Sequence, residues 1–163
     1  MVIVVGGVAG SGKTTVGRAL AARLGWEFHD ADDLHDAAAV ARMRRGGGLD
    51  DEDRYPWLLR VRRVIEEAIA RRTGAVVACS ALKAQYRLVL GEALDEVEFV
   101  FLHADRDVVR SRLEHRAGHF VGVALLDSQL QTLELPLDGL VFDASLGVDD
   151  LVELIVSTRT LQP

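Results

Sequence analysis

A glycine-rich segment near the start of the chain carries the clearest chemical signal. Gly7-Val8-Ala9-Gly10-Ser11-Gly12-Lys13-Thr14 follows an apolar run and leads into a helical pattern. Glycines let the backbone curl until several N–H groups point at one centre, and the following helix directs its positive end there. Lys13 can then reach the β- and γ-phosphates of a nucleotide, while the Thr14 hydroxyl can ligate Mg²⁺. We therefore predict a phosphate-binding loop, with nucleotide contacts from Gly7, Ala9, Gly10, Ser11, Gly12, Lys13, Thr14 and Thr15.

Two aspartates follow a short apolar segment at 26–29. Asp30 and Asp32 are two residues apart, so in an extended chain both point towards the γ-phosphate side of the loop. One can hold a Mg²⁺-bound water and the other can accept the proton of an acceptor alcohol. The alternative is a solvated acidic loop or a helix cap. His35, close behind, either hydrogen-bonds an acceptor hydroxyl or pins its own loop.

Lysine is rare in this chain. Lys13 and Lys83 are the two lysines among nineteen Lys and Arg residues. Because the chain uses arginine at almost every other basic position, a lysine indicates a position where a planar guanidinium cannot replace an ammonium group. Lys83 follows a third apolar segment, and we interpret it, together with Arg87 one turn further on, as a binding group rather than a surface charge. Ser80 is interpreted alternatively as a helix cap.

An acidic run precedes the longest helical pattern. We interpret residues 50–53 as an N-terminal charge cluster, with Pro56 at the first helical position and Gly74 at the helix end. Arg54 either pairs with this run or provides the fork that a carboxylate-bearing substrate needs.

Two arginines share one face of a helix expected at 106–116. Arg112 and Arg116 are four residues apart, and residues 117–120 interrupt the pattern as a mobile flap would. These arginines either neutralise a triphosphate when a lid at about 117–125 closes or are ordinary solvated charges. We favour the first interpretation, because a lid must exclude water from the reaction.

The order of elements defines the fold class. Apolar, β-branched strands alternate with amphipathic helices, which forces a parallel sheet with right-handed crossovers. We predict a single α/β domain over residues 1–163, of the P-loop NTPase type, with a five-stranded parallel sheet and helices on both faces. The expected strands are 2–5, 26–29, 75–78, 98–102 and 140–143, and the remaining helices are 13–24, 37–45, 86–94, 125–134 and 148–159.

Composition narrows the function. The net charge of −6 argues against nucleic acid or an anionic membrane as the main partner. Cys79 is the single cysteine, so an internal disulfide is excluded and a reducing, cytoplasmic location is expected. No apolar run approaches the roughly 20 residues needed to span a bilayer.

With these residues in place, the sequence resembles the small P-loop gluconokinases, a family related in fold to shikimate and nucleoside monophosphate kinases. The resemblance covers most of the chain. It rests on Gly7 to Thr14, Asp30-Ala31-Asp32-Asp33-Leu34-His35, Asp53-Arg54-Tyr55-Pro56-Trp57-Leu58, Cys79-Ser80-Ala81-Leu82-Lys83, Tyr86-Arg87, Arg112, Arg116, Gly118-His119-Phe120, Ser128-Gln129 and Leu133-Glu134.

This resemblance implies an activity and roles for residues. The family uses ATP and Mg²⁺ to phosphorylate the 6-hydroxyl of D-gluconate, and its members are often dimers, so a homodimer is allowed here. By position it implies Thr14 and Asp30 at the metal and Asp32 as the base. It further implies Lys13 and Arg116 in catalysis, Arg112 over the nucleotide, and an acceptor site formed by Asp32, His35, Arg54, Lys83, Arg87 and His119.

Three positions depart from the family pattern, which usually has glycine at Ala31, proline at Asp36 and asparagine at Ala39; the lid after Phe120 differs as well. Two alternatives therefore stay open: a kinase of another small anionic acceptor, such as shikimate or another sugar acid, and a non-catalytic nucleotide-binding module. A GTPase is disfavoured, because the chain contains no asparagine for the guanine-reading Asn-Lys-x-Asp motif.

Overall fold

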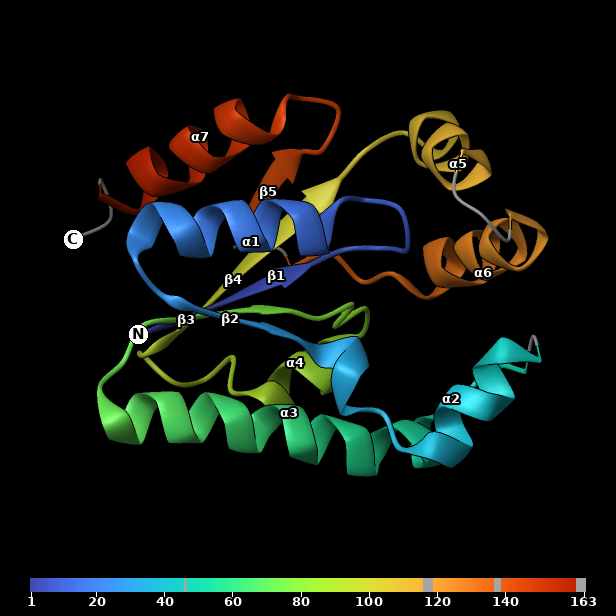
Figure 1. Ribbon diagram of the computed structural model, residues 1–163, viewed down its shortest axis with the longest axis horizontal. Coiled ribbons are helices and arrows are strands. Elements are labelled where there is room, and N and C mark those ends of the chain that lie inside the picture. The colour runs from blue at the N-terminus through green and yellow to red at the C-terminus, as the bar shows by residue number, and fades with distance from the viewer. Residues whose placement is uncertain (46, 116–118, 137–138, 161–163) are drawn as a thin grey trace.

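One parallel sheet organises the molecule. The computed structural model describes residues 1–45, 47–115, 119–136 and 139–160. Its five strands lie in the order β2-β3-β1-β4-β5, with β1 at the centre (Figure 1). The predicted five-stranded parallel sheet is confirmed. The strands are β1 (Val2–Gly6), β2 (Glu27–Asp30), β3 (Ala75–Ala78), β4 (Val97–His103) and β5 (Leu140–Asp143).

Helices cover both faces of the sheet. In Figure 1, α1 and α7 lie on one side of the strands, while α3 and α4 lie on the other. The helices α2, α5 and α6 gather beyond the carboxyl ends of the strands. The helices are α1 (Lys13–Leu24), α2 (Ala37–Arg44), α3 (Asp51–Arg71), α4 (Ala84–Leu90), α5 (Arg106–Glu114), α6 (His119–Thr132) and α7 (Val148–Thr160), with a 3₁₀ turn, η1 (Ala31–Leu34).

The central strand shows how the sequence creates two cores. Successive side chains of a strand point to opposite faces. Ile3 and Val5 accordingly pack with Leu20 and the rest of the core beneath α1 and α7, whereas Val2 and Val4 pack beneath α3 and α4. All four β1 valine and isoleucine side chains are fully buried. A continuous apolar run is what a strand covered on both faces requires.

Helix α3 departs from the prediction at both ends. It begins at Asp51, with Asp50 as N-cap in a capping box with Asp53, so Pro56 lies inside the helix rather than at its first position. The side chains of Asp50 and Asp53 satisfy the first N–H groups, and this cap outweighs the proline signal. The helix ends at Arg72 in a left-handed conformation (φ 55°). Gly74 instead leaves room for Trp26, whose ring atoms a Cβ there would meet at 2.2 Å.

Two other helices differ from the prediction. Helix α4 begins at Ala84 and ends at Leu90, because Gly91 caps it in the left-handed conformation (φ 108°). Helix α6 begins at His119, six residues before the expected start, so most of the region predicted as a lid loop is helical. The predicted interruption lay at residues 117–120; of these, His119 and Phe120 belong to the helix, and residues 117 and 118 lie outside the described residues. No helix in the described parts of the chain combines the length and apolarity of a membrane span.

Candidate active site

The phosphate-binding loop connects β1 to α1 at the carboxyl edge of the sheet. Gly7 and Gly10 adopt positive φ angles of 136° and 80°, a conformation that side chains disfavour. The N–H of Gly7 donates to the carbonyl of Ser80 at 3.3 Å, which ties the loop to the end of β3. Lys13 Nζ donates to the carbonyl of Val8 at 2.9 Å, so the lysine lies folded over the loop. The loop therefore has the curled form that the sequence predicts.

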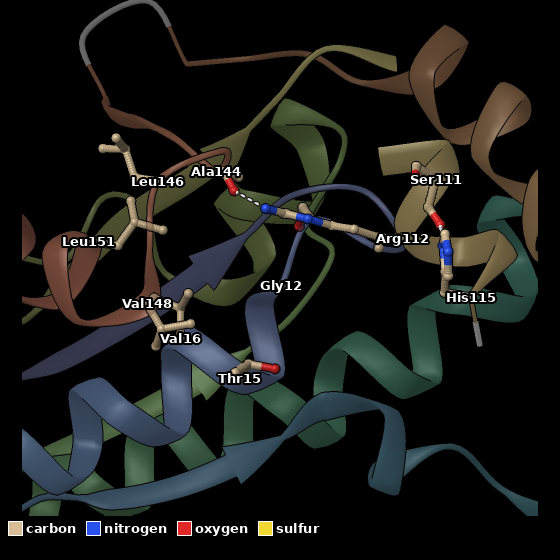
Figure 2. A pocket seen from close by; sticks show the side chains of 12 residues that line it. Gly12, Thr15, Val16, Ser111, Arg112, His115, Ala144, Leu146, Val148 and Leu151 are labelled. Atoms are coloured by element: carbon tan, nitrogen blue, oxygen red, sulfur yellow. Dashed lines mark hydrogen bonds between the residues drawn. The ribbon is translucent and has the colours of Figure 1, made fainter. Parts of the chain in front are cut away.

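A cavity of about 450 Å³ opens beside this loop. Figure 2 shows the Arg112 side chain reaching across it to the carbonyl of Ala144, to which Nη2 donates at 2.7 Å. Ser11 Oγ is buried and has no hydrogen-bond partner among the described residues, so it is available to a polar ligand. The lining combines loop and apolar groups suited to a nucleotide: Gly10, Ser11, Gly12, Thr15, Val16, Ser111, Arg112, His115, Ala144, Leu146, Val148 and Leu151.

Two oxygen ligands for a cation meet at the start of α1. Thr14 Oγ1 donates to Asp30 Oδ2 at 2.9 Å, and Asp30 Oδ1 accepts from the N–H of Asp32. Mg²⁺ in phosphoryl-transfer sites is held by one or two protein oxygens, with substrate phosphates and waters completing its shell. Among the described residues, no group of three or more His, Cys, Asp or Glu side chains could hold a metal ion. The pair Thr14 and Asp30 thus fits Mg²⁺.

Asp32 lies between the loop and a stacked pair of rings. Desolvation raises the pKa of Asp32 above the ordinary aspartate value, and the negative charge of Asp30 raises it further. Lys13 and His35 act in the opposite direction. Part of the Asp32 residue remains exposed, so a proton can be exchanged there. A carboxylate with a raised pKa beside a phosphate loop has the chemistry of a general base.

His35 is fixed by α3. Its ring stacks on Trp57 with centroids 4.5 Å apart, and Trp57 Nε1 donates to the carbonyl of Ala31 at 2.7 Å. Burial lowers the pKa of His35, and the positive charges of Arg54 and Arg60 lower it too, while Asp32 opposes them. The imidazole is therefore neutral near pH 7. Its Nδ1 is buried without a hydrogen-bond partner among the described residues. His35 is thus both pinned by its surroundings and able to bond a ligand, so both interpretations made from the sequence stand.

A second cavity, of about 680 Å³, lies between the start of α3, the start of α4 and α6. It brings together Arg54 and Lys83, which are far apart in the sequence. Arg54 Nε donates to the carbonyl of Leu49 at 3.0 Å, which anchors the guanidinium at the cavity wall. Three carboxylates, those of Asp50, Asp51 and Glu52, line the same hollow, so its charge is mixed, and Arg54 and Lys83 are the lining groups that suit an anionic molecule. Its lining residues are Gly48, Leu49, Asp50, Asp51, Glu52, Arg54, Leu82, Lys83, Tyr86, Leu125, Ser128, Gln129 and Thr132.

Asp51 is the partner of Lys83. Lys83 Nζ lies 2.7 and 2.8 Å from the two carboxylate oxygens, Gln85 Nε2 donates to Oδ2 at 2.9 Å, and the Tyr86 hydroxyl donates to Oδ1. These donors hold the pKa of Asp51 down, to about 2. The predicted charge cluster at the helix start is confirmed: Asp50 is the N-cap, and Asp51, Glu52 and Asp53 lie in the first turn. Asp50 and Asp53 form the capping box, while Asp51 also lines the cavity.

Two residues near β3 have different places from those expected. Ser80 is not a helix cap, since Lys83 occupies the N-cap of α4. Arg87, expected at the acceptor, is only 4% exposed. Its guanidinium donates to Glu92 at 2.7 Å and to the carbonyl of Glu134 at 2.6 Å, and it lies over the Phe101 ring. The sequence could not show which role Arg87 has, because an arginine one turn after Lys83 is equally consistent with a buried structural group and with a binding group.

Two departures from the family pattern find a structural explanation. Asp36 is the N-cap of α2, and its carboxylate accepts from the N–H of Ala39 at 2.8 Å. Ala31 is fully buried in η1, and its φ is not positive, so its backbone has no need of glycine. These substitutions are compatible with the same site.

Arg116 and residues 117–118 of the expected lid lie outside the described residues, as does the side chain of His119, whose backbone begins α6. One residue was missed as a site candidate: Gln129 on α6, whose Oε1 accepts from the N–H of Ala9 at 2.6 Å. The signal available in the sequence was a polar residue between the apolar positions Leu126 and Leu130 of one helix.

Comparisons with known proteins agree with this geometry. A family model described as an AAA domain matches residues 2–136. A gluconokinase of Gluconobacter oxydans is 47% identical over 137 residues, which are 83% of this chain and 76% of that protein. Two solved structures are similar throughout. A sugar kinase of Janibacter sp. has 39% identity and a TM-score of 0.89, covering 99% of this chain and 95% of the other. A gluconokinase of Sinorhizobium meliloti has 40% identity and a TM-score of 0.82, covering 95% and 89%.

The Asp51 cluster makes a prediction about stability and pH. Replacing Asp51 with asparagine should lower the free energy of unfolding at pH 7, because the carboxylate loses its donors Lys83, Tyr86 and Gln85. A depressed folded-state pKa stabilises the fold above the unfolded pKa, near 3.9, and this contribution is lost as pH falls towards about 2. The difference between wild type and Asp51→Asn should therefore shrink between pH 5 and pH 3 in urea unfolding.

The matched control is Glu52→Gln, which removes one exposed negative charge from the same helical turn. It should leave stability nearly unchanged at every pH. A difference for Asp51→Asn that stays constant down to pH 3 would contradict the ion-pair explanation.

Proposed function

This chain belongs to the AAA-domain family and, within it, to the gluconokinases, and we propose that it transfers the γ-phosphoryl group of ATP to the 6-hydroxyl of D-gluconate. The observation that carries the proposal is a pair of cavities, one beside the phosphate loop and one connected to the loop through Gln129, which lines it and bonds the N–H of Ala9. One is lined by Gly10, Gly12 and Arg112, and the other by Arg54 and Lys83. A nucleotide and a small sugar acid have the chemistry that these two linings bind.

Phosphoryl transfer depends mainly on positioning and on charge stabilisation. The loop N–H groups and Lys13 hold the phosphates, and Thr14 with Asp30 holds Mg²⁺. Bound there, the metal neutralises charge on the phosphate oxygens. Arg112 lies over the nucleotide, and Arg116, which precedes the lid at about 117–125 in the sequence, is the proposed catalytic residue that completes the neutralisation. This enclosure excludes water, which would otherwise compete with the acceptor alcohol.

Asp32 is the general base for the acceptor hydroxyl. Its raised pKa brings its basicity closer to the working pH, and the nearby Lys13 keeps the ionised form accessible. Neutral His35, oriented by Trp57, hydrogen-bonds an acceptor hydroxyl. Asp32 therefore takes the proton as the acceptor oxygen attacks the γ-phosphorus atom, and the bond to the β-γ bridging oxygen breaks.

The acceptor carboxylate is bound by Arg54 and Lys83, and His119 is a further proposed substrate-binding residue. Arg87 supports this site indirectly, by positioning α4. It holds the carbonyl of Glu134, whose carboxylate accepts from the N–H of Ala84 at 2.7 Å, and so fixes α4 with Lys83 at its N-cap. We further propose a cytoplasmic location, consistent with a single buried thiol at Cys79. A homodimer is compatible with this arrangement.

The acceptor is tested by a substrate panel. With ATP and Mg²⁺, the purified protein should release ADP when D-gluconate is added, and much more slowly with shikimate or with neutral glucose, which lacks the carboxylate. A coupled ADP assay measures each rate, and mass spectrometry of the product locates the phosphate. Faster turnover of shikimate would favour that acceptor instead. ATP binding without turnover of any acceptor would favour a nucleotide-binding module.

The base assignment is tested by Asp32→Asn. The variant keeps the size and polarity of the side chain but cannot accept the proton, so kcat should fall about 10²- to 10⁴-fold. The KM for ATP should change little. Asp33→Asn, the neighbouring change, is the matched control and should retain most of the activity. Wild-type kcat in Asp32→Asn would refute the assignment.

The acceptor cations are tested by Lys83→Met. Loss of a hydrogen bond to a charged group should raise the KM for gluconate by about 10-fold or more and leave the KM for ATP within about twofold. Arg63→Met removes an exposed cation further along α3 and should affect neither constant. Equal increases in both KM values would show that Lys83 acts on the fold rather than on the acceptor.

A further inference from the structure

One side chain connects the phosphate loop to the acceptor cavity. Gln129 is 9% exposed on α6, and its Oε1 accepts from the N–H of Ala9 at 2.6 Å. The same residue lines the cavity that contains Arg54 and Lys83. The two ends of this contact are 120 positions apart in the chain. Gln129 therefore lies at the junction where a transferring phosphoryl group has to pass from loop to acceptor.

The chemistry of a primary amide makes this position specific. The N–H of Ala9 is a donor, so the atom facing it must be the amide oxygen rather than the nitrogen. The Nε2 group sits on the same carbon as Oε1 and carries two N–H donors. With its oxygen held by the loop, the amide keeps its donors beside the phosphate-binding N–H groups. Amide N–H groups stabilise anionic oxygens, as oxyanion-type donors do.

We propose that Gln129 is a substrate-binding residue whose Nε2 donates a hydrogen bond to the γ-phosphoryl oxygen of the nucleotide, in addition to the bond that Oε1 accepts from Ala9. The proposal deepens the kinase function and rests on it. The competing explanation is that Gln129 only ties α6 to the loop. Leu126 on the same helix is fully buried in the core beneath α1 and α7, so α6 has an apolar anchor besides the Gln129 contact.

Nucleotides that differ only in the γ-phosphate separate these explanations. Titration calorimetry at pH 8, without acceptor, would measure the affinity of the protein for Mg²⁺-ADP and for Mg²⁺-AMPPNP, a non-hydrolysable ATP analogue. The experiment thus does not depend on whether gluconate is the substrate. The variants are Gln129→Ala, which removes both bonds, and Gln129→Glu, which keeps an acceptor for the N–H of Ala9 and replaces the donor with a negative charge. At pH 8 a carboxyl with an ordinary pKa near 4.3 is ionised. Gln131→Glu, at an exposed position of the same helix, is the matched control.

We expect selective losses. Gln129→Ala should lower the affinity for the analogue by about tenfold, which corresponds to the loss of a hydrogen bond to a charged group. Gln129→Glu should lower this affinity further, because the new carboxylate repels the γ-phosphate. Both should bind ADP within about twofold of wild type, which also shows that the loop is intact. Gln131→Glu should leave both affinities unchanged. Equal loss of ADP and analogue in either Gln129 variant, or wild-type affinity for the analogue in Gln129→Ala, would overturn the proposal and leave Gln129 as a tether.

Discussion

The absence of side chains at two positions of the phosphate loop is the constraint on which the rest of the site depends. A Cβ on Gly7 would lie 2.5 Å from the carbonyl oxygen of Leu102, and one on Gly10 would lie 2.8 Å from Leu113 Cγ. The loop is thus packed directly against the end of β4 and against α5. Because α5 carries Arg112, the distance from loop to arginine is set by the close contact of Gly10 with the Val109 and Leu113 side chains. A larger residue at Gly10 would move the helix and, with it, one wall of the nucleotide cavity.

Charge is arranged differently on the two sides of the loop. The chain has a net charge of −6, yet its acceptor cavity contains Arg54 and Lys83. Lys83 is balanced by Asp51, whose pKa is held at about 2, so a cation is kept at the cavity without being left uncompensated. An incoming carboxylate would share this lysine with Asp51 rather than meet an isolated charge. The acidic surface elsewhere is compatible with an anionic substrate because the attraction is local, and salt screens charges beyond about 8–10 Å.

The sequence predicts the fold well because its strongest signals are local. Buried apolar runs gave the strands, and the glycine loop with Lys13 and Thr14 gave the nucleotide side. The sequence did not allow contacts between residues far apart in the chain to be predicted. Arg87 reads as a binding cation until Glu92 and the Glu134 carbonyl are seen beside it, and Pro56 reads as a helix start until the cap at Asp50 is seen. Gln129 had only a weak signal in the sequence, a polar residue between apolar helical positions, because its partner is a backbone N–H that no residue type reveals.

Trp57 explains how the proposed base, Asp32, and the proposed acceptor cation Arg54 keep their relative positions. Its indole N–H holds the carbonyl of Ala31, between Asp30 and Asp32, and its ring holds His35. The same residue is buried in the first half of α3, whose start carries Asp51 and Arg54. One side chain thus joins the end of β2 to the start of α3. The 3₁₀ turn η1 and helix α3 come from separate parts of the chain. Their packing through Trp57 therefore brings Asp32 on η1 and Arg54 on α3 into one site.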